Sequence, residues 1–463
     1  MFIGRSEELG LLEKLYAKNS LNVVLVSGEY KIGKTALLQE FLQKKSAAYF
    51  AARNALSTVN LAAFCLELKE QGLWGPKNEF RSWDSVLSTL FFKATQQRLV
   101  LVIDDVQYLF DSAPEFFTAF AKYAQKYKKQ LRLSVIFSGA PFAEMERVLL
   151  KNQEMQIKNY INAVIKLGAM DYWEAQPFLE GFTEEEKLFL YGAAGGNPHY
   201  MSYLDAELSF KDNLKKLFFE PAAPLYKEPI QLLKLDLREP ATYNTILCSV
   251  ACGAGRLNEI AAAADMECNK VSKYLNVLLT MGILQRVNPA FSSSNKISYY
   301  EIANNMFVFW YQFVFPYMSS IAIGRGHQVL RNNIMPRIDL FAAHIFKKIC
   351  LQYCYKLKKR NDFMCDFEQI SPWWQGSGSN KISVDFIADD TDVICLIDCN
   401  WSNKKADSDV LKKLLAKGEH FTGVDKRFLC FSKKGFTDEC MEISAGDPHL
   451  RLISLKYMKR LLV

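Results

Sequence analysis

Residues 22–35 read Asn22-Val-Val-Leu-Val-Ser-Gly28-Glu-Tyr-Lys-Ile-Gly33-Lys34-Thr35, and this stretch decides the fold of the amino-terminal part of the chain. Its first six residues form a short, valine-rich run, which is typical of a strand buried on both faces of a parallel sheet. Residues 28–35 match the pattern GxxxxGK followed by Ser or Thr, and the helical sequence ALLQEFLQKK comes next. A strand, a glycine-rich loop and a helix in this order predict a phosphate-binding loop in an α/β domain.

The loop residues predict a nucleoside triphosphate as the ligand, bound together with magnesium. The glycines allow backbone N–H groups to surround a phosphate, and the following helix adds a favourable dipole. Lys34 is expected to contact the β- and γ-phosphates, and the Thr35 hydroxyl is expected to bind Mg2+ of an ATP complex. The predicted nucleotide-contacting residues of the loop are Gly28, Lys31, Ile32, Gly33, Lys34, Thr35 and Ala36.

A second apolar run, residues 99–103, ends in two adjacent acids. Asp104 stands at the carboxyl end of this predicted strand, where an aspartate holds magnesium directly or through water. Asp105 follows it. A third predicted strand, residues 131–137, ends at Ser138, which either senses the γ-phosphate or serves as an ordinary turn residue. The candidate catalytic residues are Lys34, Asp104, Asp105 and Ser138.

Three further motifs resemble those of archaeal-type ATPases in the STAND branch of the AAA-related P-loop proteins. Residues 4–8 (GRSEE) are similar to the GRxxE motif of this family, which is implied to lie against the adenine. Residues 104–109 (DDVQYL) are close to its DEFQYL motif. Residues 195–200 (GGNPHY) resemble the GGxPxY motif, which closes over the base from a helical lid or, alternatively, forms only a helix cap and turn. The resemblance implies that Arg5 and Pro198 contact the nucleotide.

Two positions depart from the family pattern. Asp105 stands where AAA-type ATPases usually carry a glutamate that polarises the attacking water, so the carboxylate reaches one methylene less far. Residues 155–160 contain no arginine, although an arginine-bearing segment is expected there. The sequence therefore predicts an ATP-binding protein with slow hydrolysis that acts as a nucleotide-driven molecular switch. The alternatives are a DNA-binding or DNA-processing protein and an interaction scaffold that binds nucleotide and a partner protein without turnover.

The middle of the chain predicts a winged helix-turn-helix, because three short helical patterns precede a hairpin pattern. The family resemblance places the same module here. Its third helix carries outward-facing residue types that suit contacts with phosphates and base edges, although such a module can instead pack against an ATPase core. These candidate DNA contacts are Asn269, Lys270, Ser272, Lys273 and Asn276. The expected helices span 239–252, 257–264 and 269–281, and the expected hairpin strands span 283–287 and 296–302.

The last third of the chain resembles the restriction-endonuclease-like, PD-(D/E)xK domain of these ATPases. Its expected elements are a helix at 339–357, strands at 381–388, 393–398 and 427–431, and a final helix. In that fold two acids hold magnesium and a lysine helps to activate water. Asp385 matches the first acid, and Asp398-Cys-Asn400 stands where the family has Glu-Cys-Lys.

The substitutions in this last region predict a domain without nuclease activity. Asn400 has replaced the lysine, and Lys347 stands where a glutamate is usual and would oppose a metal ion. Lys404 or Lys405 offers a weak replacement for the missing lysine. The vestigial site would then comprise Asp385, Asp398 and Asn400, with the two acids still able to hold a divalent ion.

Length and composition predict a multidomain α/β protein of the cytoplasm. A chain of 463 residues is too long for one core, and its net charge of +7 permits nucleic-acid contact without establishing it. Neither a signal peptide nor a membrane span is expected, and the 11 cysteines lack the spacing of a disulfide framework or zinc site. The expected domains are a P-loop ATPase with helical lid (1–225), a winged helix-turn-helix (226–303), an aromatic helical linker (304–336) and a nuclease-like domain (337–463).

Overall fold

The computed structural model describes residues 2–75, 80–140, 145–152, 156–237, 239–292, 298–376, 381–390 and 392–459. The chain forms two compact units. The first contains residues 1–169 with 197–199, and the second contains residues 170–196 with 200–463. Residues 170–196 and 200–225, which the expected ATPase domain with helical lid (1–225) includes, therefore group with the second unit. The expected boundaries at 303 and 336 lie inside that unit and stay predictions.

The first unit is built on a parallel sheet of five strands in the order β2-β3-β4-β1-β5. Every residue of β3 and β4 is buried, as the apolar runs in the sequence predict. The strands are β1 (Asn22–Gly28), β2 (Ala47–Ala51), β3 (Leu99–Asp104), β4 (Leu133–Gly139) and β5 (Ile161–Leu167). Because all strands run in one direction, the loops that follow β1, β3 and β4 meet at one edge of the sheet.

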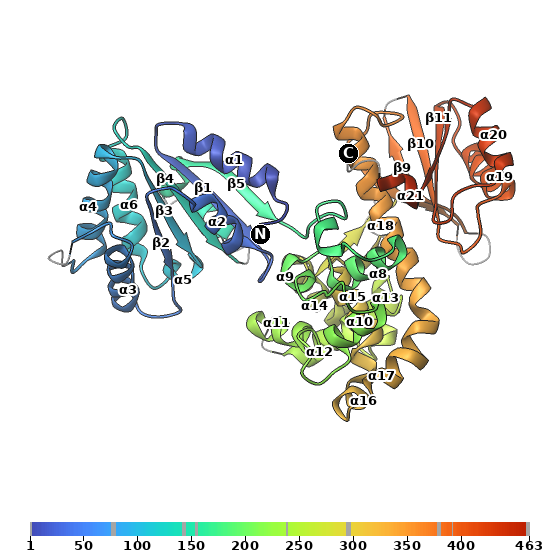
Figure 1. The fold of residues 1–463 in the computed structure, drawn as a ribbon, viewed down its shortest axis with the longest axis horizontal. Helices are drawn as coiled ribbons and strands as arrows, with labels where there is room; N and C mark the ends of the chain where they lie inside the picture. The colour runs from blue at the N-terminus through green and yellow to red at the C-terminus, as the bar shows by residue number, and fades with distance from the viewer. Residues whose placement is uncertain are drawn as a thin grey trace. The chain divides into compact units, whose positions relative to one another are not determined.

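Helices cover both faces of this sheet (Figure 1). Leu12 and Phe41, on the first two helices, pack with Val24 and Val102 on one face. The third, fourth and sixth helices pack on the opposite face, where aliphatic side chains surround a group of aromatic rings. The helices are α1 (Ser6–Ala17), α2 (Lys34–Leu42), α3 (Ser57–Glu70), α4 (Trp83–Gln96), α5 (Gln107–Phe110) and α6 (Pro114–Lys126).

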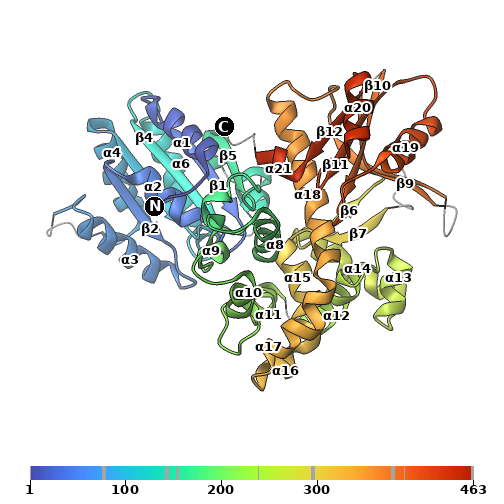
Figure 2. The same ribbon diagram turned by 45° about the vertical axis from the view of Figure 1, so that its right-hand side comes forward.

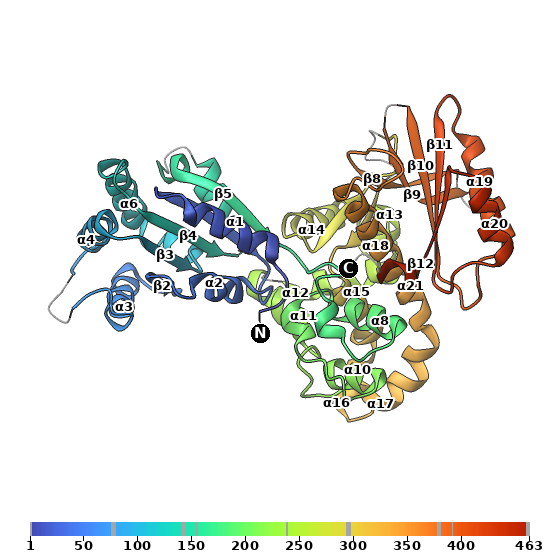
Figure 3. The ribbon, with the colours of Figure 1, turned by 45° about the horizontal axis from the view of Figure 1, so that its top comes forward.

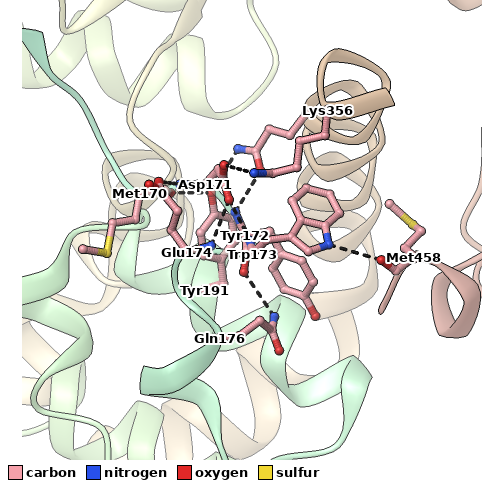
Figure 4. Close-up of polar contacts among 10 residues, drawn as sticks. Met170, Asp171, Tyr172, Trp173, Glu174, Gln176, Tyr191, Lys356 and Met458 are labelled. Atoms are coloured by element: carbon pink, nitrogen blue, oxygen red, sulfur yellow. Dashed lines mark hydrogen bonds and ion pairs between the residues drawn. The ribbon is translucent and has the colours of Figure 1, made fainter. Parts of the chain in front are cut away.

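The second unit begins with a segment that is bound to its own helices (Figure 4). The Asp171 carboxylate pairs with Lys356 at 2.7 Å, and the Trp173 indole N–H donates to the Met458 carbonyl at 3.2 Å. The Tyr191 hydroxyl donates to the Met170 carbonyl at 2.9 Å. These contacts attach residues 170–196 to the second unit.

The helices of the second unit that precede the carboxyl-terminal sheet share one apolar core. A Cβ added at Gly192 of α8 would lie 2.5 Å from the Ile345 side chain of α18, so only glycine permits this approach. The aromatic run of α15 is buried, and no helix among the described residues is long and apolar enough to cross a membrane. The helices before the carboxyl-terminal sheet are α8 (Glu184–Ala194), α9 (Pro198–Met201), α10 (Phe210–Phe218), α11 (Glu228–Asp236), α12 (Pro240–Ala251), α13 (Leu257–Ala263), α14 (Cys268–Thr280), α15 (Asn305–Phe313), α16 (Met318–Ala322), α17 (Gly326–Val329) and α18 (Ile338–Lys359).

Helices α12, α13 and α14 are followed by an antiparallel hairpin of β6 (Leu284–Val287) and β7 (Tyr299–Ile302) (Figure 2). Val271, Leu275 and Leu278 form the buried face of α14. The observed helices agree with the expected ranges to within two residues. Lys296, at the start of the second expected hairpin strand, lies outside the described residues.

A mixed sheet in the order β12-β11-β10-β9-β8 forms the carboxyl-terminal part of the second unit. Helix α18 covers one face, and α19 and α20 cover the other (Figure 3). The expectation of three strands and one final helix was wrong, because β8 and β12 are also present and β12 separates two terminal helices. The elements are β8 (Ile370–Gln375), β9 (Ile382–Asp389), β10 (Val393–Asn400), α19 (Ser408–Lys417), β11 (Asp425–Ser432), α20 (Asp438–Gly446), β12 (Leu450–Ser454) and α21 (Leu455–Met458).

Candidate functional site

The loop after β1 has a backbone that requires both of its glycines. A Cβ added at Gly28 would lie 2.6 Å from the Leu167 carbonyl oxygen and 2.8 Å from Ile32 Cγ2. Gly33 has φ of 97° and caps α2, in the left-handed region that favours glycine. The loop therefore turns sharply from the strand into the amino terminus of α2, where helix N–H groups and the helix dipole favour an anion.

Lys34 is held inside this loop by backbone oxygens. Its side chain is buried, and Nζ donates to the carbonyls of Gly28 at 2.9 Å and Glu29 at 3.0 Å. Burial lowers the pKa of Lys34, while the nearby carboxylates of Asp104 and Asp105 oppose this shift. The ammonium group thus lies among neutral acceptors, which leaves its charge available for a phosphate.

Asp104, at the end of β3, brings Thr35 and a tyrosine together. Its Oδ2 accepts hydrogen bonds from the Thr35 hydroxyl at 3.1 Å and from the Tyr49 hydroxyl at 2.7 Å. Burial and the Asp104 carboxylate raise the pKa of Tyr49, so this hydroxyl remains a donor. The structure therefore places the two predicted magnesium ligands side by side. Tyr49 was missed in the sequence, because only the pairing of β2 with β3 brings it to this position.

Asp105 and Ser138 lie near Gln107, in a region where two buried polar oxygens lack a hydrogen-bond partner among the described residues. Asp105 adopts φ of 52° and accepts a hydrogen bond from Gln107 Nε2 at 3.2 Å. Burial and the neighbouring Asp104 raise the pKa of Asp105. The Ser138 hydroxyl and the Gln107 side-chain oxygen are buried and have no partner among the described residues. Buried polar atoms without partners are costly, so a water or ligand oxygen is expected to bind them.

Arg5 and Pro198 both lie beside the loop. Arg5 is only 4% exposed. Its guanidinium donates to the carbonyls of Gly168 at 2.5 Å and Ile32 at 3.4 Å, and it forms an ion pair with Glu8. Arg5 therefore braces the loop through backbone oxygens. The Pro198 ring lies 3.5 Å from the position of a Cβ added at Gly33.

The remaining predicted loop residues differ in exposure. Ile32 is buried beneath the loop, whereas Lys31 and Ala36 are exposed. Met155, in the segment expected to carry an arginine, lies outside the described residues, and Gln156–Tyr160 forms a short 3-10 helix without one.

The two acids of the carboxyl-terminal sheet also meet. The Asp385 N–H donates to Asp398 Oδ1 at 3.2 Å, and the Cys399 N–H donates to Asp385 Oδ2 at 2.9 Å. Each carboxylate forms an ion pair with a lysine: Lys347 of α18 binds Asp385, and Lys417 of α19 binds Asp398. The described residues contain no group of three His, Cys, Asp or Glu side chains that suits a metal ion.

Other predicted residues of this region lie apart from these ion pairs. Asn400 is half-buried two residues further along β10, and Lys404 and Lys405 are exposed on the following loop. Lys417 was missed in the sequence, because it reaches Asp398 from a helix rather than from the strand motif. On α14 the candidate DNA contacts all lie away from the buried face; Ser272 is half-buried, and the exposed ones are Asn269, Lys270, Lys273 and Asn276.

The parallel sheet and its loop define the amino-terminal part of the chain as a P-loop ATPase domain. Residues 2–204 match a family described as an ATPase domain predominantly from Archaea. Residues 310–411 match a second family, described as archaeal and bacterial proteins of unknown function. The chain therefore carries an ATPase domain of the archaeal type.

Individual relatives agree with this assignment. The chain is 24% identical over 416 residues to an uncharacterised protein of Methanocaldococcus jannaschii, covering 89% of this chain and 90% of that protein. It is 40% identical over 45 residues to an uncharacterised ATP-binding protein of the same organism, covering 10% of this chain and 76% of that protein. A Walker-type ATPase of Pyrococcus abyssi aligns with 67% of this chain and 96% of its own, at 17% identity and a TM-score of 0.51, and supports the fold.

Proposed function

We propose that this protein is a magnesium-dependent ATPase of low turnover that acts as a nucleotide-driven switch. The observation that carries the proposal is the meeting of Lys34, Thr35 and Asp104 at one end of the parallel sheet. A hydroxyl and a carboxylate are the hard oxygen ligands that magnesium prefers, and the lysine supplies charge for the phosphates. The unpartnered Ser138 hydroxyl lies on the next strand, where it suits an oxygen of the nucleotide or of water.

Each residue has a defined part in this proposal. Thr35 and Asp104 would hold magnesium, which neutralises charge on the phosphates when it is bound. Lys34 exchanges the carbonyls of Gly28 and Glu29 for phosphate oxygens. Asp105 accepts a proton from, or orients, the attacking water.

Slow turnover follows from the surroundings of Asp105. Its carboxylate is one methylene shorter than that of a glutamate and is bound by Gln107. Burial and the neighbouring Asp104 raise the pKa of Asp105, so the short reach and the Gln107 hydrogen bond, rather than weak basicity, limit this carboxylate. No arginine stands in Gln156–Tyr160 to stabilise the developing charge. These features support a slow switch of the STAND type better than a rapid motor.

Phosphate release from ATP tests the proposal. The wild-type protein is expected to release phosphate slowly and only with magnesium, and Lys34→Ala is expected to abolish this release. Lys18→Ala, which alters an exposed lysine at the end of α1, serves as the matched control. Equal release by wild type and Lys34→Ala would contradict an ATPase. ATP binding without any release would favour the scaffold without turnover.

A second candidate function is DNA binding by α12–α14 and the β6–β7 hairpin as a winged helix-turn-helix. It is favoured by the exposure of Lys270 and Lys273 on α14. Fluorescence anisotropy with duplex DNA should show binding that weakens with salt and is reduced in Lys270→Ala/Lys273→Ala. Absence of salt-dependent binding would remove this candidate.

We expect no cleavage of DNA by the carboxyl-terminal domain, which we interpret as nuclease-like, because lysines neutralise both of its acids. Plasmid nicking in magnesium or manganese tests this expectation, and Asp385→Ala provides the control for contaminating activity.

A further inference from the structure

The second unit contains a cavity of about 710 Å³ that the ATPase proposal does not use. Its walls are the β6–β7 hairpin, helix α18, and strands β8 and β9 with the segment before β8. This volume falls within the range of about 300–1,000 Å³ that is usual for small-molecule sites. The charged side chains that line it are Arg286, Glu301, Lys347, Lys348, Lys381 and Asp385.

Positive charge exceeds negative charge in this lining, because four of these six side chains are cationic. Both carboxylates already accept hydrogen bonds, Asp385 from Lys347 and Glu301 from Gln285. Among the described residues, the Arg286 guanidinium donates to a neutral group, the Tyr300 hydroxyl, at 3.0 Å. The surplus of positive charge therefore favours an anionic occupant.

Lys348 is a cation of this lining whose charge is only weakly compensated. Its ammonium lies 3.5 Å from its nearest recorded acceptor, the Ala303 carbonyl, at the limit of a hydrogen bond. Burial lowers the pKa of Lys348, and Glu301 opposes this shift only in part. A buried ammonium group without a bonded counter-charge is costly, and an entering anion would remove this cost.

His344, one turn before Lys348 on α18, also lines the cavity and has an unused polar atom. Its Nε2 is buried and has no partner among the described residues. Burial and the nearby charges of Lys348 and Lys347 lower the pKa of His344 to about 3, so the ring is neutral at physiological pH. A neutral ring nitrogen can donate a hydrogen bond to a ligand oxygen.

The ion pairs of the neighbouring acids exclude an alternative use of the cavity as a metal site. Asp385 is the only acid of that pair in the lining, and its Oδ1 carries the Lys347 ammonium. Its Oδ2 accepts the Cys399 N–H, and the positive charge of Lys347 beside Oδ1 opposes a cation at this carboxylate. Because Lys347 neutralises Asp385, this carboxylate also repels an anion less strongly.

We propose that this cavity binds the phosphoryl group of a small molecule, with Lys348 and Arg286 as its counter-charges. A phosphoryl group carries up to two negative charges and several acceptor oxygens, which matches several lysine and arginine donors better than a single carboxylate does. Tyr299 and Trp374, whose ring centroids lie 5.4 Å apart, also line the cavity and offer aromatic surface to a base or another apolar moiety. Inorganic phosphate and a nucleoside monophosphate share the recognised group.

The test uses full-length protein in a Lys34→Ala background, so that the phosphate loop does not contribute. Inorganic phosphate and AMP are titrated separately by calorimetry and by thermal unfolding. We expect at least one probe to bind with one site and to raise the melting temperature. Lys348→Met and, separately, Arg286→Gln should each weaken this binding at least tenfold, whereas Lys412→Met, an exposed lysine on α19, should leave it unchanged.

Lys348→Met also distinguishes a ligand role from a structural role. Because it replaces a buried ammonium group with an apolar chain of similar length, it should leave the ligand-free protein as stable as its parent or more stable. Arg286 is exposed, so its variant tests binding with little risk to folding. Binding of AMP alone would assign a nucleotide, and binding of phosphate alone would assign the free anion. Binding of neither probe, or binding unaffected by both variants, would overturn the proposal.

Discussion

The two sites of this protein use the same residue types in opposite ways. In the phosphate loop, Lys34 donates to backbone carbonyls, and Asp104 receives hydroxyl groups from Thr35 and Tyr49. In the carboxyl-terminal sheet, Asp385 and Asp398 each form an ion pair with a lysine. In both sites the aspartates stand on strands, and the lysines come from helices: Lys34 from α2, Lys347 from α18 and Lys417 from α19.

The difference shows that the position of the ammonium group decides what a lysine–aspartate site can bind. A lysine surrounded by carbonyls keeps its charge for a phosphate, and the separate carboxylate stays available to a metal ion. A lysine bound to the carboxylate neutralises that carboxylate and competes with a metal ion for it. The first site is therefore suited to a magnesium nucleotide, and the second is not suited to a metal.

The largest expected effect is a loss of ATP affinity when the carboxylate charge of Asp104 is removed, whereas removal of a carboxylate charge at the second site should have no such effect. Asp104→Asn should weaken ATP affinity in magnesium about 100-fold, equal to about 2.7 kcal/mol, because the metal loses an anionic ligand. The same substitution at the second site, Asp398→Asn, should leave ATP affinity unchanged. Titration with a fluorescent ATP analogue, with and without a chelator, measures both. Equal affinities in the two variants would remove Asp104 from the site.

The second effect concerns pH, through the buried histidine beside Lys347. The pKa of His344 is about 3 in the folded state and 6.5 as the ordinary value, so the folded state binds fewer protons between these limits. Stability therefore falls as pH falls from 6.5 towards 3, by about 2 kcal/mol at pH 5 from this group. Urea unfolding of His344→Gln at pH 7.5 and pH 5 should show a smaller loss than wild type. The exposed His327 provides the control variant, His327→Gln, which should follow wild type.

The third effect is on turnover. Asp105→Glu restores the longer carboxylate and should raise phosphate release about tenfold, within the usual contribution of a positioned base. Because Asp105 adopts φ of 52°, glutamate should also lower stability by about 1 kcal/mol. Asp111→Glu, an exposed acid after α5, is the control for a nonspecific change. Unchanged turnover with intact ATP binding would assign the slow step elsewhere.

The smallest expected effect is weak metal binding at the second site after its two lysines are removed, which would make its carboxylates resemble that of Asp104. In Lys347→Met/Lys417→Met both carboxylates lose their ammonium partners, so one Mn2+ should bind weakly where wild type binds none at this position. Electron paramagnetic resonance of free Mn2+ measures this binding, in the presence of Asp104→Asn to remove the nucleotide-site metal. Addition of Asp385→Asn should abolish it. A double variant without Mn2+ binding would show that the acids lack metal geometry even when they are free.

Local pattern was sufficient to predict much of the ATPase domain. The runs at β1 and β3 are continuous and apolar, and Gly28 and Gly33 stand at fixed distances from them, so their strand, loop and helix were predicted together. By contrast, β8 contains Pro372 and β12 has only five residues, so their sequences are weak strand signals, and the structure shows that both pair with neighbouring strands. The grouping of residues 170–196 with the second unit depends on contacts such as Asp171 with Lys356, which lie 185 positions apart in sequence.

The sequence by itself determined the phosphate loop, because GxxxxGK followed by Thr after a buried strand encodes its conformation through adjacent residues. It also predicted that Asp385 and Asp398 stand on strands, as they do in β9 and β10. Only the tertiary structure decided which partners these acids have. Tyr49 reaches Asp104, and Lys417 reaches Asp398, through strand pairing and helix packing that no local motif records. Because charges interact through space, the partner of a lysine ammonium group is set by distance in the folded protein and not by sequence separation.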